Sequence, residues 1–317
     1  MCIRDSNISE ANLKAHGTAT PVLDSAGNQI GTTYSMQSKS WLRGRDKTKS
    51  VTVAANGTKL FTTTKDYGNG KVKTTQQDGF MKITTTNNNG KITEDVSMQA
   101  AMMKSLRKKD GSINTIAWDN AVKNSAHAPE KLKAAMMLQY AQEALPGVNP
   151  KLLGTLNDAQ INISTDANGN EVISIAETKS DGSSQVIRMT KAANKKTLLG
   201  GEISNGRTLL EVESTDKYGD RVSYATDGII NRKKESQVDK NGNVKMDKKG
   251  RPLEKTEYAV SDYYAKYVSH PVSSQGQFHG SIPADQIMFD DQEKDAAVAQ
   301  LTEDRLKGRK HAIGGFK

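Results

Sequence analysis

The sequence contains a single cysteine, no long apolar run and few aromatic residues. Its one cysteine, Cys2, excludes a disulfide framework and a thiolate metal site. No apolar run approaches the roughly 18 residues that a membrane-spanning helix needs. Aromatic residues make up 5% of the 317 residues, and Leu, Ile, Val and Phe together number 58. Because the net charge of +9 is modest for this length, we expect a folded protein with a thin hydrophobic core.

The first six residues resemble translated sequencing adaptor, which occurs on reading frames assembled from environmental DNA; they read MCIRDS. We expect the native chain to begin after them, and we leave residues 1–6 out of the fold assignment. The native N-terminus is then missing, so the absence of a signal peptide says nothing about secretion.

A recurring turn sequence, Asp/Asn-x-x-Gly followed closely by an apolar residue, is the strongest local signal. An Asp or Asn at the first position of a type I turn accepts hydrogen bonds from the backbone two residues on, and the glycine adopts the left-handed conformation. The six copies begin at Asp24, Asn87, Asp166, Asp216, Asp239 and Asp247. Shorter Asn-Gly and Asp-Gly signals between them, including those that begin at Asp78 and Asp227, indicate further hairpins.

Between the turns, apolar and polar residues alternate, as in residues 172–176 and 209–213. Period two with short returns predicts antiparallel meanders. We therefore predict a mainly β fold, with antiparallel β-meanders in two blocks, an inserted helical pair and a C-terminal helix. The expected divisions are a first β-block over 7–96, a helical insert over 97–150, a second β-block over 151–260 and a C-terminal segment over 261–317.

Helical periodicity is concentrated in three places. Ser97 is expected to cap a helix whose Met98, Met102 and Leu106 share a face. A second helix should begin at Pro129 and end before the Pro-Gly pair at 146–147. The acidic run from residue 290 should open a final helix, and its apolar positions are Val298, Leu301 and Leu306.

One turn also matches most of a calcium-binding loop. Its positions 1, 3, 5 and 12 are Asp166, Asn168, Asn170 and Glu177. Position 6, where glycine makes the sharp bend, is Glu171, and the following residues alternate as in a strand. The sequence therefore favours a hairpin over calcium, and no cofactor is expected.

Residues 239–244 and 247–251 resemble the turn part of YD repeats in Rhs-type surface proteins. The tyrosine that precedes the aspartate in those repeats is absent, and the spacing is irregular. Shared hairpin chemistry accounts for this resemblance, so the chain is not assigned to that family.

Basic residues alternate between positions 41 and 51. In an extended segment they share one face about 25–30 Å long, which consists of Trp41, Arg43, Arg45, Lys47, Lys49 and Val51. Such a ladder is able to track phosphates or sulfates, and Arg43, Arg45, Lys47 and Lys49 are the candidate contacts. The pattern is equally typical of a solvated sheet face or a lysine-protected edge, which we favour. Other basic clusters, such as residues 232–234, are expected at turns.

Four of the nine tyrosines lie within ten residues, and they are Tyr258, Tyr263, Tyr264 and Tyr267. Such a cluster is able to stack on sugars or bases, and we take it as a candidate ligand-stacking site. In a chain so poor in aromatics it more often anchors packing between two segments.

No catalytic motif is found: the sequence has no nucleophile elbow, zinc-protease helix, phosphate-binding loop or dinucleotide fingerprint. The most compact set of acid–base groups is Tyr264, His270, His279 and Asp285, which keeps a carbohydrate-active enzyme as a further alternative.

We therefore expect a non-enzymatic structural or adhesive protein, as a phage virion or tail component or a cell-surface protein, located on a virion or outside the cell. The alternative is a protein that binds a polyanion, either nucleic acid or anionic glycan. The thin core and open sheet edges predict a homo-oligomer, or contact with other structural subunits, through the segment after Ser261 and the C-terminal helix.

Overall fold

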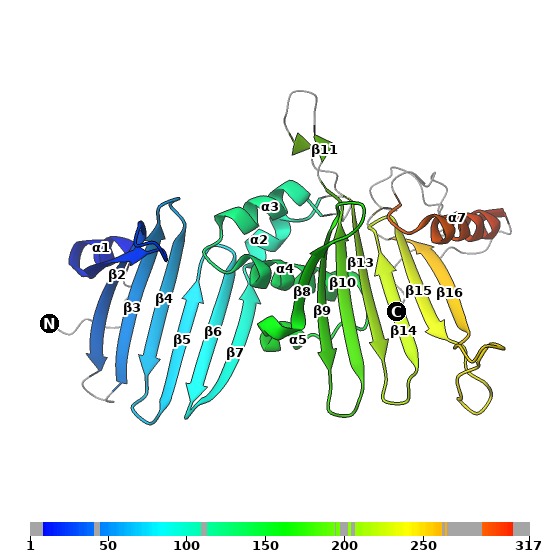
Figure 1. The fold of residues 1–317 in the computed structure, drawn as a ribbon, viewed down its shortest axis with the longest axis horizontal. Coiled ribbons are helices and arrows are strands. Elements are labelled where there is room, and N and C mark those ends of the chain that lie inside the picture. Colours follow the sequence, from blue (N-terminus) through cyan, green and yellow to red (C-terminus); the bar gives the residue numbers. More distant parts are fainter. Residues whose placement is uncertain are drawn as a thin grey trace, which may run out of the picture. The chain divides into compact units, whose positions relative to one another are not determined.

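The computed structural model describes residues 9–40, 45–108, 113–193, 195–196, 202–203, 207–261, 264 and 287–306. Its fold is mainly β, with two antiparallel seven-stranded sheets (Figure 1). The chain divides into two compact units. The first comprises residues 1–102, 120–135 and 151–157, and the second comprises 103–119, 136–150 and 158–317.

The sheet of the first unit is a meander in which each strand pairs with its neighbours in sequence. Alternating side chains and Asx-type turns produce this arrangement, because each short return sets an antiparallel register. The strands are β1 (Thr18–Leu23), β2 (Gln29–Ser40), β3 (Arg45–Ala54), β4 (Lys59–Asp66), β5 (Lys71–Gln77), β6 (Met81–Asn88) and β7 (Lys91–Met98).

Among the described residues, five α-helices precede β8 in the chain, and four of them are short. They are α1 (Glu10–His16), α2 (Ala100–Ser105), α3 (Thr115–Asn124), α4 (Pro129–Ala144) and α5 (Leu152–Thr155), followed by the 3-10 turn Asp158–Gln160. In the first unit α1 contacts β2 and β3, and α5 contacts β7. The first half of α4 lies in the first unit, where Lys131 Nζ pairs with Glu94 at 2.7 Å.

The sheet of the second unit is again a meander. Its strands are β8 (Ile161–Thr165), β9 (Glu171–Thr178), β10 (Ser184–Lys191), β13 (Thr208–Thr215), β14 (Arg221–Thr226), β15 (Ile230–Ser236) and β16 (Glu254–Val260). A two-stranded ribbon of β11 (Lys195–Lys196) and β12 (Glu202–Ile203) is inserted between β10 and β13. One face of the sheet supplies core residues, namely Ile173, Ile175, Ile187, Met189, Leu210 and Val212, all almost fully buried.

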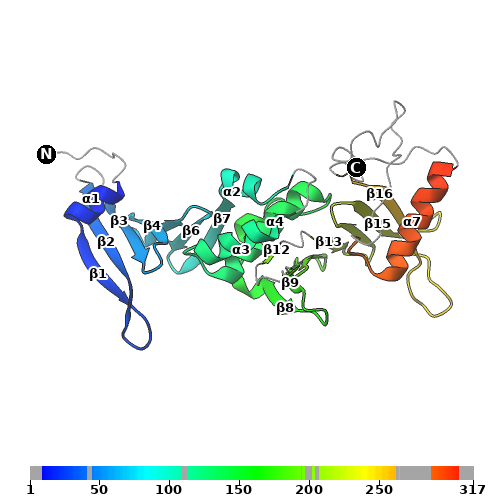
Figure 2. The same cartoon turned by 90° about the horizontal axis from the view of Figure 1, so that it is seen from above.

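A second hydrophobic cluster lies beneath α7 (Asp291–Leu306), which packs on β16 (Figure 2). Its buried members are Ala225, Ile230, Tyr258, Val260, Ile287, Phe289, Ala297 and Leu301. The second sheet is thus covered on the β15–β16 side by a helix that follows it in sequence.

The structure confirms the predicted fold class. The six predicted Asp/Asn-x-x-Gly turns form, and the φ angles of their glycines lie between 74° and 91°. The helix predicted from Pro129 is α4, and the final helix is α7, with Asp290 as its cap. The predicted start at Ser97 is wrong, because β7 continues to Met98 and α2 begins at Ala100.

Three helices, α1, α3 and α5, were not predicted. They are 7, 10 and 4 residues long, so any periodicity covers few turns. Each buries apolar side chains in the fold, such as Leu13, Trp118 and Leu152. Among the described residues no helix is both long and apolar enough to cross a membrane.

Candidate polyanion-binding face

One face of the first sheet carries eight lysines, and we call it the lysine face. Residues directly opposite each other on antiparallel strands share a face, and so do residues two apart on one strand. The pairings Lys47 with Lys65 and Lys65 with Lys73 therefore place all three on the same side. By the same register the face comprises Lys47, Lys49, Lys59, Lys65, Lys71, Lys73, Lys82 and Lys91.

Three of these lysines form a row across adjacent strands. Lys47 of β3, Lys65 of β4 and Lys73 of β5 stand directly opposite one another. Neighbouring strands are about 4.8 Å apart, so the row is about 10 Å wide at the backbone. Like charges directly opposite each other destabilise a sheet, and β3 and β4 carry a second such pair, Asp46 opposite Asp66, on the other face.

Acidic residues are scarce on the lysine face. Among the described strand residues of this sheet, Asp95 of β7 is the one carboxylate on that side, opposite Thr84. Glu10 of α1 adds a second and pairs with Lys59 at 3.0 Å. Lys71 lies over the Tyr67 ring, 5.6 Å from its centroid. The face therefore keeps a large positive excess.

Exposure makes much of this charge available. Lys65, Lys71, Lys73 and Lys91 are exposed, whereas Lys47, Lys49 and Lys82 are half-buried. Phe61, between Val51 and Gln77 on the same face, is 40% exposed. Threonines fill the positions between the lysines on β4 to β7 and are able to add hydroxyl hydrogen bonds.

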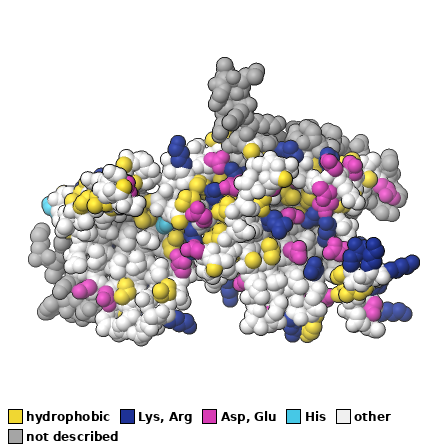
Figure 3. Space-filling model, in the orientation of Figure 1, with side chains coloured by type: hydrophobic (Ala, Val, Ile, Leu, Met, Phe, Trp, Pro, Cys, Tyr) yellow, Lys and Arg dark blue, Asp and Glu magenta, His cyan; other side chains and the backbone are white. Residues whose placement is uncertain are grey.

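The opposite face of the same sheet is mostly uncharged in its middle rows, and its carboxylates include Asp46, Asp66 and Glu94. Ser50, Thr62 and Gln76 form one row across β3 to β5, and the hydroxyls of Thr64 and Thr74 lie 3.3 Å apart in the next. In Figure 3 the surface over the first sheet is mostly white, with a few acidic side chains and few Lys or Arg side chains. Among the described strand residues of this sheet, all lysines except Lys39 are on the lysine face.

Two lysines of the second sheet stand opposite glutamates. On β15 and β16, Lys233 stands opposite Glu257, and Lys255 stands opposite Glu235. Each lysine also pairs with a glutamate on its own strand, at 2.5 Å in both cases. Alternating charges in a pleated pair are an ordinary stabilising pattern. Lys233 and Lys255 thus face glutamates, whereas Lys47, Lys65 and Lys73 face one another.

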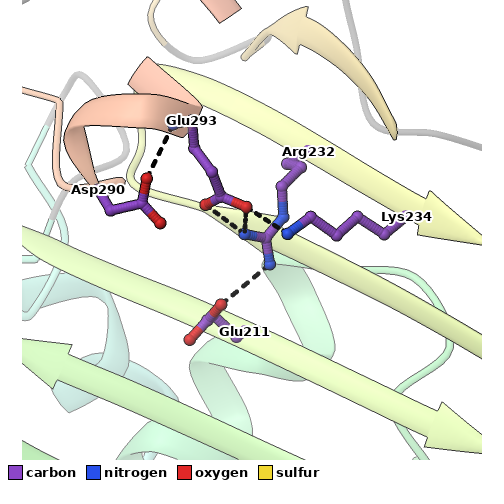
Figure 4. Close-up of polar contacts among 5 residues, drawn as sticks. All are labelled: Glu211, Arg232, Lys234, Asp290 and Glu293. Carbon is purple, nitrogen blue, oxygen red and sulfur yellow. Dashed lines mark hydrogen bonds and ion pairs between the residues drawn. The ribbon is translucent and has the colours of Figure 1, made fainter. Parts of the chain in front are cut away.

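A second group of charges lies where α7 begins (Figure 4). The Arg232 guanidinium donates to both carboxylate oxygens of Glu293, at 2.8 and 2.6 Å, and to Glu211 at 2.9 Å. Lys234 pairs with the same Glu293, whose N–H donates to Asp290. Arg232 is 6% exposed, so its charge is satisfied inside the unit. We interpret this group as a link between α7 and the sheet.

This group corrects the expectation that residues 232–234 lie at a turn. They belong to β15, and Arg232 is buried. A run of three basic residues resembles a solvated turn in sequence. The carboxylates that neutralise it come from positions 211 and 293, far away along the chain.

The predicted ladder is found in part. Arg45 begins β3, and Lys47 and Lys49 lie on the lysine face. Trp41 and Arg43 lie outside the described residues. Lys65 and Lys73 were missed because the alternation within one strand was read without its neighbours. Lysines also alternate in residues 59–65 and 71–73. Aligning these segments with residues 45–54 through the two turns between the strands would have placed Lys65 and Lys73 beside Lys47.

The tyrosine cluster is described in part. Tyr258 is 8% exposed and belongs to the cluster beneath α7, against which Tyr264 also packs. Tyr263 and Tyr267 lie outside the described residues, as do His270, His279 and Asp285. Packing is the role that this placement favours, and ligand stacking stays a prediction.

The loop that resembles a calcium site is a hairpin turn. Asp166 Oδ1 accepts hydrogen bonds from the backbone N–H groups of Asn168 and Asn170, at 2.8 and 2.9 Å. These bonds hold the pKa of Asp166 below its ordinary value. Over the described part of the chain, no three His, Cys, Asp or Glu side chains gather as metal ligands.

Comparisons with known proteins add no assignment. No protein-family model matches the chain, and no curated protein is significantly similar to it.

Proposed function

We propose that this chain is a non-enzymatic adhesive protein that binds a linear polyanion through the lysine face of its first sheet. The observation that carries the proposal is the row of Lys47, Lys65 and Lys73, in direct register on adjacent strands. On β15 and β16, by contrast, Lys233 and Lys255 stand opposite glutamates. A concentration of positive charge on one face of a sheet attracts a polyanion.

The physical basis is electrostatic. A polymer that carries a charge every few ångströms releases condensed counterions when lysines neutralise it, and this release supplies most of the affinity. Lysine heads on flexible stems suit binding without strict sequence or pattern. We therefore expect tight binding at low salt and a steep loss of affinity as salt rises.

A surface location fits this role, and we propose a virion or cell surface. There an anionic polymer serves as an attachment site, and the first sheet is the body that presents the lysines. The chain has no cysteine beyond Cys2, so this body depends on strand pairing and a thin core rather than on disulfides.

The test uses heparin and duplex DNA as probes, with affinity measured between 50 and 300 mM salt as an order-of-magnitude range for counterion effects. Replacing Lys47, Lys65 and Lys73 with Thr should weaken binding and reduce the salt slope on DNA by about 0.9 for each lost contact. The matched control replaces Lys233 and Lys255, which are paired with glutamates.

The control removes two charges and the lysine-face variant three, so the losses are compared per charge removed. An equal loss per charge would mean that only overall charge matters, and the proposed site would be abandoned. No binding by the unmodified chain at 50 mM salt would reject the function itself. Shortening of bound heparin during the assay would contradict the non-enzymatic part of the proposal.

A further inference from the structure

The two sheets have the same construction. Each has seven antiparallel strands, and sequential strands are neighbours throughout. A helix of 16 residues comes after each sheet in the chain: α7 after β16, and α4 after β7, with α2 and α3 before it and its second half in the second unit. The β11–β12 ribbon and the residues between β15 and β16 are additions to the second sheet that leave this order intact.

The first hairpin of each sheet has the same turn. In β1–β2, Asp24 Oδ1 accepts from the N–H groups of Ala26 and Asn28, and its Oδ2 accepts from the Asn28 amide. In β8–β9, Asp166 makes the same three bonds with Asn168 and Asn170. The sequence Asp-x-x-Gly-Asn occupies the first hairpin of both meanders, and it recurs with the same three bonds at Asp239, between β15 and β16.

The turn between the fifth and sixth strands is also repeated. Asp78 Oδ1 accepts from the N–H groups of Phe80 and Met81, both at 2.8 Å. Asp227 Oδ1 accepts from those of Ile229 and Ile230, at 2.9 and 2.8 Å. Both turns read Asp-Gly followed by two apolar residues.

The residue after the seventh strand makes the equivalent backbone hydrogen bond in each unit. The N–H of Gln99 donates to the Phe80 carbonyl at 2.9 Å, and that of Ser261 donates to the Ile229 carbonyl at 2.8 Å. The two sheets therefore agree at the first turn, at the fifth turn and at the exit from the last strand.

The second oxygen of each aspartate reaches the segment that leads into the helix. Asp78 Oδ2 accepts from the Ser125 hydroxyl at 2.6 Å and from the Ala126 N–H at 3.0 Å. Asp227 Oδ2 accepts from the Met288 N–H at 3.0 Å. In both units the helix begins three residues after that N–H donor, at 129 and at 291.

An Asp-Gly turn does not by itself make this contact. In the β9–β10 hairpin, Asp181 accepts from the N–H and hydroxyl of Ser183, and it is exposed. Asp78 and Asp227 are instead 7% and 6% exposed. A buried carboxylate that bridges a turn and a distant backbone N–H is a specific arrangement, because burial without such donors is strongly unfavourable.

We infer that the two units contain copies of one motif, a seven-stranded meander against which the start of a helix docks, and that Asp78 and Asp227 are the equivalent latch residues that fix the starts of α4 and α7 to their sheets. In the second unit, apolar contacts of Ala297 and Leu301 hold the rest of α7.

The test is hydrogen exchange of the full chain, read separately for α4 and α7. Asp227→Asn keeps one oxygen for the turn and places an amide NH2 opposite the Met288 N–H. It should raise exchange in the first turns of α7 at least tenfold and leave α4 unchanged. Ser125→Ala should have a smaller effect confined to the start of α4, and the control Asp181→Asn should affect neither helix.

Unchanged exchange in α7 of Asp227→Asn, with a folded second sheet, would overturn the inference. If Asp227→Asn does not fold, the Ser125→Ala variant decides, because it leaves the β5–β6 turn intact. Exchange at the start of α4 equal to that of the unmodified chain would then reject the latch.

Discussion

Replacing Lys65 with Thr should stabilise the first unit while it weakens polyanion binding. Lys65 has Lys47 opposite it on one side and Lys73 on the other, so this single change removes two like-charge pairs. At roughly 5 Å in water each pair repels by about 0.8 kcal/mol. Screening at physiological salt, with a Debye length of about 8 Å, reduces this to about 0.4 kcal/mol.

The expected gain is therefore about 0.8 kcal/mol at physiological salt and about 1.5 kcal/mol at low salt. These values lie within the range for cross-strand pairs, about 0.2–1 kcal/mol each. Threonine also has a higher β-propensity than lysine, which acts in the same direction. The gain should shrink as salt is added.

The assay is hydrogen exchange of the β3–β5 amides at two salt concentrations, together with the DNA salt slope. The control Lys255→Thr removes attractive pairs with Glu235 and Glu257 and should destabilise the second sheet. A destabilised first sheet in Lys65→Thr would refute the reasoning, because the lysine row would then be a source of stability. An unchanged salt slope would mean that Lys65 makes no contact with the bound DNA.

Three further outcomes are expected. Gly169→Val should destabilise the second sheet by about 1–2 kcal/mol, since the glycine has φ +79°, and an unaltered urea midpoint would contradict this. Burial raises the pKa of Asp78, but hydrogen bonds led by that of Ser125 outweigh it and hold the pKa below its ordinary value. The stability that Asp78 adds is then present above about pH 3.9 and is lost as pH falls through its lower folded pKa, so the effect of Asp78→Asn should vanish in acid unfolding curves. Light scattering with size-exclusion chromatography should find an oligomer for the full chain and a smaller species for a chain that ends at residue 283; a compact monomer at high micromolar concentration would reject assembly.

The meanders were predictable because their determinants are local. An Asp or Asn and a Gly three residues later specify the turn, and alternation specifies the flanking strands, as at Asp166 and Gly169. The helix from Pro129 was predictable for the same reason, since its first-turn proline and its periodicity lie within one segment. The short helices α1 and α3 have no comparable local signal.

The lysine row could not be predicted from one strand. Lys47 and Lys65 are 18 positions apart, and a shift of one residue in the pairing would put them on opposite faces. The contacts of the latch residues with the helix starts could not be predicted for a different reason. Asp78 and Asp227 were recognised as turn residues, but their second oxygen meets residues 126 and 288, and sequence alone does not indicate that contact.

The meander order has a consequence for how this chain folds and changes in length. Every strand of both sheets pairs with a neighbour in sequence, so most strand contacts close short loops and the contact order of each sheet is low. Such a sheet is able to form hairpin by hairpin. A segment inserted between two strands does not require any other strand to be rethreaded, and the β11–β12 ribbon occupies such a position.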